Sequence, residues 1–572
     1  MYRAPDESQR CVDENRIAHM KTERQVVEGE MKELRDQFVP RRGRFNLSEE
    51  RKRGRVKHTD SSPLFAVRTL GSGMHAGLTS PSRPWQKSTI EDKDLAKWQP
   101  VERWLSLVDE RMMALYQRAG VYAALPFMYP EFGAIGTMCG LMLNDPRSLF
   151  RVEAYTVGQY YLAKSDTGEY DTMARELQMT VRQLVSRFAQ LPDGKLDMSR
   201  ISDRVRRMWE HQKQRENMVE IWHIVQPDGR GAWSSTWYES GESRQPPLKV
   251  ARFNKNPILA AAWESIGIEP YAVNCPGMVA VGDAMALQID DRTKSQAIER
   301  ADNPPMQGPV KAVNLRPGSY TQVDDTALQK GGIRSVYDFR PDIQWRLANI
   351  QARTNRINSA FFADLFLMLT MDERAQRATA EEIRARYDEK VLALGPTLEQ
   401  ANSMLRQLHS FAFDAMLQQS MPIWRGVLDG EPMLPEPPEE LMRDGAEIEP
   451  EFISALQQAQ RSAALQPMER FATAVGSIAQ LTQKLPDKFD SDIWLERYAE
   501  AVGVDPGVVR DDEEVAAIRE QEAQTQRMQQ MAAMAPAAGQ MAGAMRDAAE
   551  AVPQEGSVLS ALTGAMQAGA PQ

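Results

Sequence analysis

The segment DIQWRLANIQARTNRINSAFFADLFLML, residues 342–369, decides how the rest of this chain is read. It contains neither glycine nor proline, the two residues that most often interrupt a helix. Residues that recur at three- and four-residue steps share one side of a helix, and one set of positions here follows that spacing. The set is Leu347, Ile350, Thr354, Ile357, Phe361, Leu365 and Met368. We therefore predict one long helix over 343–369 with a mainly apolar face.

The opposite side of this predicted helix is polar. It carries arginine, asparagine and glutamine side chains, which are mostly exposed in folded proteins. They are Arg346, Gln351, Arg353, Asn355, Arg356 and Asn358. We expect this side of the helix to face water.

A short polar segment, residues 370–378, follows the helix. Its sequence is TMDERAQRA, and its only cations are Arg374 and Arg377. Because long helices are predicted on both sides, we expect the helices to set the position of this segment.

A second long helix is predicted over 379–425. Thr379 and Glu382 have the spacing of a capping box, in which the hydroxyl and the carboxylate each accept a hydrogen bond from a backbone N–H at the helix start. Gly395 and Pro396 fall in its interior, where proline removes a hydrogen-bond donor. We predict that this pair kinks the helix.

The composition is that of a water-soluble protein. At 572 residues the chain is long enough for several domains, and its hydrophobic share of 42% is ordinary. The formal net charge of −10 has the wrong sign for a surface that wraps nucleic acid. The beginning of the chain has no apolar signal region, and no run is apolar enough to cross a membrane. We expect a protein of a reducing compartment with no membrane partner.

No motif of catalysis or cofactor binding is present in the sequence. Cys11, Cys139 and Cys275 lie far apart, and the histidines have no paired ligand spacing. Gly71 and Gly73 lack the following Lys-Ser/Thr of a phosphate-binding loop. A nucleophile elbow and a dinucleotide fingerprint are also absent. We predict neither an enzyme nor a bound metal or cofactor.

The N-terminal segment, residues 1–60, combines a charged helix with a basic run. Residues 13–38 carry a thin apolar stripe at helical spacing, and arginine and lysine are frequent over 41–57. Such a run most often forms a solvated surface. We favour that interpretation over contact with an acidic neighbouring subunit or with DNA.

Residues 61–276 predict a mixed α+β region in a chain that is mainly helical. Apolar residues at helical spacing predict the helices, and alternation of apolar and polar residues on both sides of a turn predicts the hairpins. The indicated elements are helices at 64–78 and 98–125, a hairpin at 150–164 with its turn at 166–168, and a second hairpin around Pro227-Asp228-Gly229. The small residues of the first helix favour close helix packing.

A helix within 277–305, over 283–301, is unusually polar. Its apolar positions are sparse among many charges, and they are Met285, Ile289, Ala297 and Ile298. So weak a stripe cannot form a core by itself. We expect this helix to pack against copies of itself in an oligomer.

Short motifs along the chain resemble a known family. In chain order they are Gly77–Pro81 followed by Trp85, Arg175 followed by Thr180, Gln183 and Leu184, Pro304–Met306, Leu315–Gly318, Ala360–Phe366, Thr379–Ile383, Leu394–Pro396 and Glu513–Arg519. With these motifs the sequence resembles the head-to-tail connector (portal) proteins of short-tailed, podovirus-like bacteriophages. It departs from them at Gln86, where phenylalanine is usual, and at 273–277, where Gly-Arg-Gly-Pro is usual.

The resemblance implies a ring, usually of twelve copies, at one vertex of a phage capsid. Double-stranded DNA would enter and leave through its channel. Terminase would dock during packaging and tail adaptor or tail proteins afterwards, and the major capsid and scaffolding proteins would be further partners. The protein is then expected in the virion, after assembly in the bacterial host cytoplasm. The second hypothesis is a non-portal structural virion protein, such as an internal core protein.

The resemblance also implies a portal fold with named regions. These are 1–60 as the N-terminal helix and basic segment, 61–276 as the wing, 277–305 and 343–369 as the two stem helices, 306–342 as the clip, 370–378 as the channel loop, 379–425 as a long kinked wing helix, 426–509 as wing and crown, and 510–572 as a C-terminal helix, barrel or tail.

The channel loop would then lie at the narrowest part of the pore. A ring repeats Arg374 and Arg377 once per subunit, so many guanidinium groups would face the phosphates of passing DNA. The alternative is that both arginines pair with neighbouring carboxylates and only cap the next helix. Those carboxylates are Asp372, Glu373, Glu381 and Glu382.

Overall fold

The computed structural model describes the chain in separate ranges. They are 7–45; 58–302 without 93–94, 97, 146, 192–193 and 242–245; 306–307; 334–335; 342–368; 394–420; 433–454 without 445–447; 471–478; 489–502; and positions 515, 519, 521, 524 and 525. The chain divides into two compact units, 1–466 and 467–572. Within the described ranges, no helix has the length and apolar character needed to span a lipid bilayer.

The first unit begins with helices that pack on one another. They are α1 (Glu7–Phe38), α2 (Ser62–Leu78), α4 (Gln99–Arg118) and α5 (Val121–Ala134). The close packing expected of the small residues in α2 is confirmed. A Cβ added at Gly71 would collide with Pro130 of α5, and one added at Gly73 would collide with Phe366.

The single helix expected over 98–125 is instead two helices. Gly120 separates α4 from α5, and its φ of +75° is a left-handed conformation that glycine adopts without steric cost. The apolar spacing continues across the break, so spacing alone did not reveal it.

A three-stranded antiparallel sheet of order β3-β2-β9 packs against α5. Its strands are β2 (Thr137–Asp145), β3 (Leu149–Tyr155) and β9 (Ile258–Ala262). Together with α2, α4, α5 and α13 this sheet encloses the main core. Core side chains such as Leu70, Met112, Phe132 and Met138 have no exposed surface.

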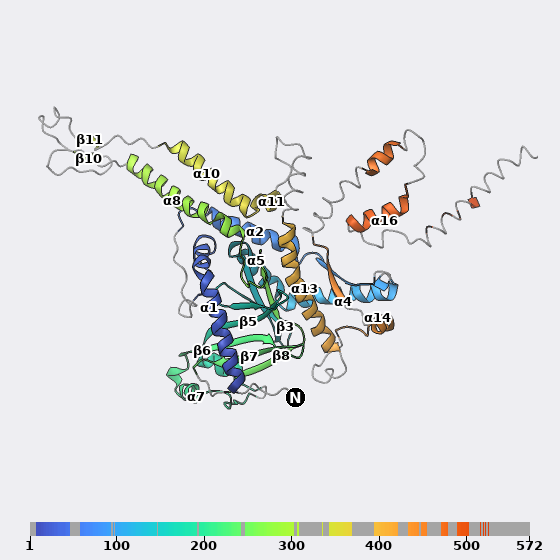
Figure 1. Ribbon diagram of the computed structural model, residues 1–572, viewed down its shortest axis with the longest axis horizontal. Helices are drawn as coiled ribbons and strands as arrows, with labels where there is room; N and C mark the ends of the chain where they lie inside the picture. Colours follow the sequence, from blue (N-terminus) through green and yellow to red (C-terminus); the bar gives the residue numbers. More distant parts are fainter. Residues whose placement is uncertain are drawn as a thin grey trace, which may run out of the picture. The chain divides into compact units, whose positions relative to one another are not determined.

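A five-stranded antiparallel sheet has the order β4-β5-β6-β7-β8. Its strands are β4 (Tyr161–Lys164), β5 (Tyr170–Thr180), β6 (Met218–Pro227), β7 (Trp233–Glu239) and β8 (Lys249–Phe253). Helix α1 covers one face, where Ile17 and Met20 pack with Tyr238 (Figure 1). Helices α6 (Val181–Phe188) and α7 (Asp203–Glu210) cover the other face, and a short 3-10 helix, Gln212–Gln214, follows α7.

Both expected hairpins are present, one of them with a different first strand. Strands β6 and β7 pair around Pro227–Gly229, and β4 and β5 pair around the turn at 166–168. The segment 150–164 is not one strand, however. Its first half lies in β3, which pairs with β2 in the other sheet. The capping box of Thr180 and Gln183 forms at the start of α6.

Strand β1 (Gln86–Ile90) pairs with β12 (Ile448–Phe452), far away in the sequence. The ring of Trp85, which is buried, stacks on Phe452 at 6.4 Å between centroids. Phe452 is the last residue of this strand. Helix α13 (Gly395–Ser420) packs on the sheets, and α14 (Glu439–Asp444) precedes β12.

The basic run after α1 is described only as far as residue 45. Within it, Arg42 is not a solvated side chain as expected. Its guanidinium lies 4.1 Å from the ring centroid of Phe127 and 3.7 Å from the carboxylate of Glu131. Residues 46–57 lie outside the described residues.

The remaining elements of the first unit are α8 (Pro276–Asp302), β10 (Met306–Gln307), β11 (Arg334–Ser335), α10 (Ile343–Ala360) and α11 (Ala363–Met368). The second unit contains a helical segment at 471–478 and helix α16 (Ser491–Val502), where Trp494 and Tyr498 stack at 4.8 Å. The fold is therefore α+β, as predicted.

Candidate functional site

Helices α8 and α10 form an antiparallel pair that we consider the candidate functional site (Figure 1). Their facing side chains give the direction. Asp283 near the start of α8 binds Arg356 near the end of α10, whereas Asp290 further along α8 binds Arg353 and Asn349. Contacts therefore progress in opposite directions along the two helices.

The pair is joined by a continuous set of ionic hydrogen bonds. Arg356 donates to both carboxylate oxygens of Asp283, at 2.8 and 2.6 Å. Arg353 donates from Nε to Asp290 at 2.8 Å and from Nη1 to Asp283 at 3.1 Å. Arg353 thus bridges two aspartates, which lie seven residues apart and so share one face of α8.

These contacts correct the expectation for Arg353, whose side chain is only 24% exposed and bridges two carboxylates of α8. Arg356 also binds Asp283, but its side chain stays 55% exposed, as expected. The hydrogen bond from Arg356 is the largest influence that holds the pKa of Asp283 below its ordinary value. Asp283 therefore remains ionised in the neutral range and keeps the pair charged.

The first turns of α8 are anchored in the main core. Gly277 approaches α5 so closely that an added Cβ would collide with the carbonyl of Ala134. Ala280, Ala284 and Leu287 of the same face are buried. Of the apolar positions expected on this helix, only Ala297 is buried, and Ile289 is 65% exposed.

A polar contact further along α8 holds the segment that precedes α2. The side-chain amide of Gln288 donates to the carbonyl of Asp60 at 2.8 Å, and its oxygen accepts from the backbone N–H of Thr59 at 2.8 Å. One side chain thus pairs with the backbone in both directions.

The helix predicted over 343–369 is interrupted near its end. Helix α10 stops at Ala360, and Phe362 has φ +52°, an uncommon left-handed conformation for a residue with a side chain. Its ring lies over Trp263, with 6.4 Å between centroids. Phe361 packs against Phe38 of α1 at 5.0 Å. Packing of these aromatic rings against α1 and the sheet explains why the helix breaks here rather than continuing.

Apolar side chains remain exposed on the helix pair. On α8, Val279 is 67% exposed, and on α10, Trp345 and Leu347 are 64% and 49% exposed. On α8, Val279 and Ile289 lie on the side opposite the buried Ala284. The predicted stripe of α10 is buried only at its far end, at Ile357 and beyond.

The residues predicted from sequence as channel sites fall mainly outside the described residues. Arg374, Arg377, Thr379 and Glu382 all lie within 369–393, which the structure does not describe. Their roles stay predictions.

Gly395 and Pro396 are described, and they occupy the first turn of α13 rather than a helix interior. Leu394 before them is in a turn. In a first turn the missing N–H of proline leaves no broken hydrogen bond. The predicted kink depends on residues before 394, which lie outside the described residues.

The ionic contacts between α8 and α10 were missed at the level of sequence. Asp283 and Asp290 had a usable signal in their seven-residue spacing. Their partners could not be identified from it, because Arg346, Arg353 and Arg356 occupy similar positions on one polar face. Among the described residues, no group of three or more histidine, cysteine or acidic side chains could hold a metal ion.

Comparison with known proteins identifies relatives over most of the chain. The family model described as "Bacteriophage head to tail connecting protein" matches residues 14–509. A portal protein of Salmonella phage epsilon15 is 35% identical, over 97% of this chain and 98% of its own length. A probable portal protein of Bordetella phage BPP-1 is 34% identical, over 91% and 92%.

Among solved structures, a chain of "Neck of empty GTA particle computed with C6 symmetry" aligns with a TM-score of 0.32 and 10% identity. The alignment covers 78% of this chain and 91% of that chain. So loose a similarity identifies neither the detailed fold nor the function.

Proposed function

The chain belongs to the bacteriophage head-to-tail connecting protein family and functions as a phage portal protein, and we propose that copies of it close into a ring that conducts double-stranded DNA. The second hypothesis, an internal core protein, is set aside because the two curated relatives are named a portal protein and a probable portal protein. Portal proteins are structural components of the particle, and we propose no catalysed reaction.

The exposed apolar residues of α8 and α10 carry the ring proposal. Trp345 and Ile289 leave 64% and 65% of their surface to solvent in the single chain. Large apolar side chains exposed on a rigid helix pair favour contact with another protein surface. A neighbouring copy that covers them would bury this surface and complete the packing of two otherwise polar helices.

The charge of the chain supports a conduit rather than a tight DNA binder. Each arginine or lysine contact to a phosphate adds affinity, so a pore that lets DNA slide needs few of them. The formal net charge of −10 fits such a pore. We propose that Arg374 and Arg377 of the segment 370–378 are the basic exception and face the DNA.

The division into wing, stem, clip and crown is part of the same proposal. It takes α8 and α10 as the stem and the residues between them as the clip. Twelve copies, docking of terminase and then of tail proteins, and contacts with the capsid and scaffolding proteins follow from the family and complete it. The site of action would be the head–tail vertex of the virion, after assembly in the host cytoplasm.

The ring is tested by the mass and shape of the purified protein. We expect a closed particle with a central hole in negative-stain images, and a mass several times the 64.5 kDa of one chain. Replacing both exposed residues, I289D with W345D, should shift the mass toward that of a single chain. In the ring, the two aspartates would be buried without a charged partner at the contact between subunits, and this would weaken the contact.

V12D is the matched control. Val12 of α1 is 55% exposed, and the neighbouring Asp13 binds Tyr238 of the five-stranded sheet, so this substitution adds a charge at a comparably exposed apolar residue on a different part of the chain. A wild-type protein that remains at 64.5 kDa at micromolar concentration would contradict the ring. A ring unchanged by I289D/W345D would place the subunit contact elsewhere.

A further inference from the structure

A row of side chains crosses the five-stranded sheet on the face covered by α6. The strand register pairs Arg175 of β5 with His223 of β6, His223 with Trp237 of β7, and Trp237 with Lys249 of β8. Directly paired residues lie on the same face of a sheet. The row therefore places a cation at each end and two aromatic rings between them.

His223 in this row does not add or remove charge. Its Nδ1 accepts a hydrogen bond from Nε of Arg175 at 3.1 Å. The ring proton is therefore on Nε2, which donates to the hydroxyl of Ser235 at 2.8 Å. Its ring stacks on Trp237 at 3.8 Å between centroids. Burial, followed by the two nearby arginines, lowers the pKa of His223 well below its ordinary value. The imidazole is neutral and acts as a spacer.

Arg187 of α6 adds a third cation above the row. Its guanidinium lies 4.5 Å from the ring centroid of Trp237, within the range of a cation–π contact. Among the described residues, no carboxylate forms an ion pair with Arg187 or Lys249. Burial and then the neighbouring arginines lower the pKa of Lys249, and the same causes lower the pKa of Arg187 against the opposing effect of Glu153.

One carboxylate is present for four cations in this cluster. Glu153 of β3 lies 2.5 Å from Arg151 and 3.5 Å from Arg175. It can neutralise one positive charge, and Arg187 and Lys249 remain without an ionic partner among the described residues. An excess of positive charge at fixed positions attracts an anion.

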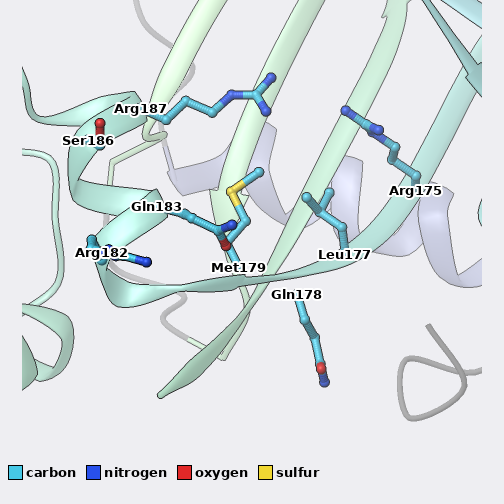
Figure 2. Close-up of a pocket in the computed structure, with 8 residues that line it drawn as sticks. All are labelled: Arg175, Leu177, Gln178, Met179, Arg182, Gln183, Ser186 and Arg187. Carbon is cyan, nitrogen blue, oxygen red and sulfur yellow. The ribbon is translucent and has the colours of Figure 1, made fainter. Parts of the chain in front are cut away.

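Arg175 and Arg187 of this cluster line a pocket of about 670 Å³ between β5 and α6, and Lys249 lies outside its lining, paired with Trp237 in the strand register. Figure 2 shows the guanidinium ends of Arg175 and Arg187 pointing toward one another across Met179, while Gln178 points away on the other side of the strand. Leu177 and Met179 supply an apolar floor. A pocket of this size accepts a few side chains rather than a flat surface.

We propose that this pocket binds an acidic segment of a partner protein, with side-chain carboxylates held by Arg187 and Arg175 in the pocket and by Lys249 at the adjoining end of the row. Planar guanidinium groups match carboxylates with two hydrogen bonds each. The apolar floor accepts the side chain of a neighbouring residue in the same segment. The proposal concerns the sheet region and stands whether or not the chain closes into a ring.

An acidic protein segment fits better than nucleic acid because of how the cations are arranged. Arg175, Arg182 and Arg187 converge on one concavity instead of forming a line along which a strand could lie.

The test uses the full-length protein and a fluorescein-labelled short peptide in which glutamate and leucine alternate. We expect fluorescence anisotropy to show binding of this peptide and little binding of a matched peptide with glutamine for glutamate. R187Q/K249Q should weaken binding by about tenfold or more, because two charged partners are lost. The exposed Lys213, replaced in K213Q, is the control and should leave binding unchanged.

Two further measurements separate the alternatives. R187K keeps the charge but loses the planar fork, so it should weaken binding less than R187Q, and thermal melting should confirm that each variant is folded. Equal peptide binding by wild type and the folded R187Q/K249Q variant would overturn the proposal. Tighter binding of a short DNA duplex that the same variant abolishes would assign the pocket to phosphates and overturn it as well.

Discussion

The main core and the α8–α10 pair are stabilised in opposite ways within one chain. In the core, Phe132 and Met112 have no exposed surface, and sheet and helices pack around them. In the helix pair, arginines and aspartates make the contacts while Trp345 and Ile289 stay exposed. The core is complete in a single chain, whereas the helix pair presents a surface that a neighbour can complete.

The difference follows from the size of the two kinds of interaction. Burial of a large apolar side chain contributes about 1.5 to 3 kcal/mol. An ion pair in contact with solvent contributes about 0 to 1 kcal/mol. Ionic contacts between α8 and α10 therefore set their direction and alignment more than they stabilise the fold.

The largest expected effect on stability comes from replacing one aromatic residue in each region by alanine. F132A should lower the free energy of unfolding by about 3 to 5 kcal/mol, because Phe132 is fully buried and packs against Trp263 with 5.0 Å between ring centroids. W345A should change it by less than about 0.5 kcal/mol but weaken ring formation. Denaturation of each variant under conditions that dissociate the ring, together with light scattering, measures both effects. Equal destabilisation by the two substitutions would remove the distinction between core and helix pair.

A pH effect in the core region is expected next. Asp109 of α4 accepts hydrogen bonds from the backbone N–H and hydroxyl of Ser88 of β1, at 2.9 and 2.6 Å. His409 of α13 reaches the same hydroxyl with Nε2 at 3.0 Å. Burial raises the pKa of Asp109 to about 6 and lowers the pKa of His409 to about 4.

The two groups act in opposite directions with pH. Because the folded pKa of Asp109 is raised, its stabilising contribution is complete below about pH 4 and is lost as the pH rises through 6. His409 is stabilising above about pH 6.5, and this contribution is lost as the pH falls through 4.

D109N removes the first group. Relative to wild type, its stability should therefore rise by about 2 to 3 kcal/mol between pH 4 and pH 8. Urea denaturation across that range measures the change, and H409Q is the comparison that removes only the low-pH effect. A pH-independent difference between D109N and wild type would show that Asp109 is not the titrating group.

The smallest effect is expected for the ionic contacts of the helix pair. D283N removes the shared partner of Arg353 and Arg356, both of which are accessible to solvent, so we expect only a slight decrease in melting temperature at low salt. High salt should reduce the difference from wild type. Because the pKa of Asp283 is lowered, its contribution is present above about pH 4 and is lost as the pH falls below that value. A large loss of stability that does not depend on salt would show that the pair forms part of the core.

Local patterns in the sequence predicted much of this structure correctly. The helix over 283–301 lies within α8, the hairpin around Pro227–Gly229 is present, and the family relationship follows from short motifs. Each of these depends on residues close together in the chain. Hydrophobic spacing and a turn need only neighbours within a few positions.

Features set by distant residues could be found only in the tertiary structure. Phe362 ends the helix that spacing predicted to continue, because Trp263 and Phe38 offer its aromatic segment a packing site. Strand β1 has a partner about 360 residues later along the chain. The cations of the β5–α6 pocket, like Asp283 and Arg356, are ordinary polar residues when read in order. The pocket cations form a cluster, and Asp283 and Arg356 form an ion pair, only because the fold brings separate elements together. Local periodicity in a sequence does not specify which distant element will pack there.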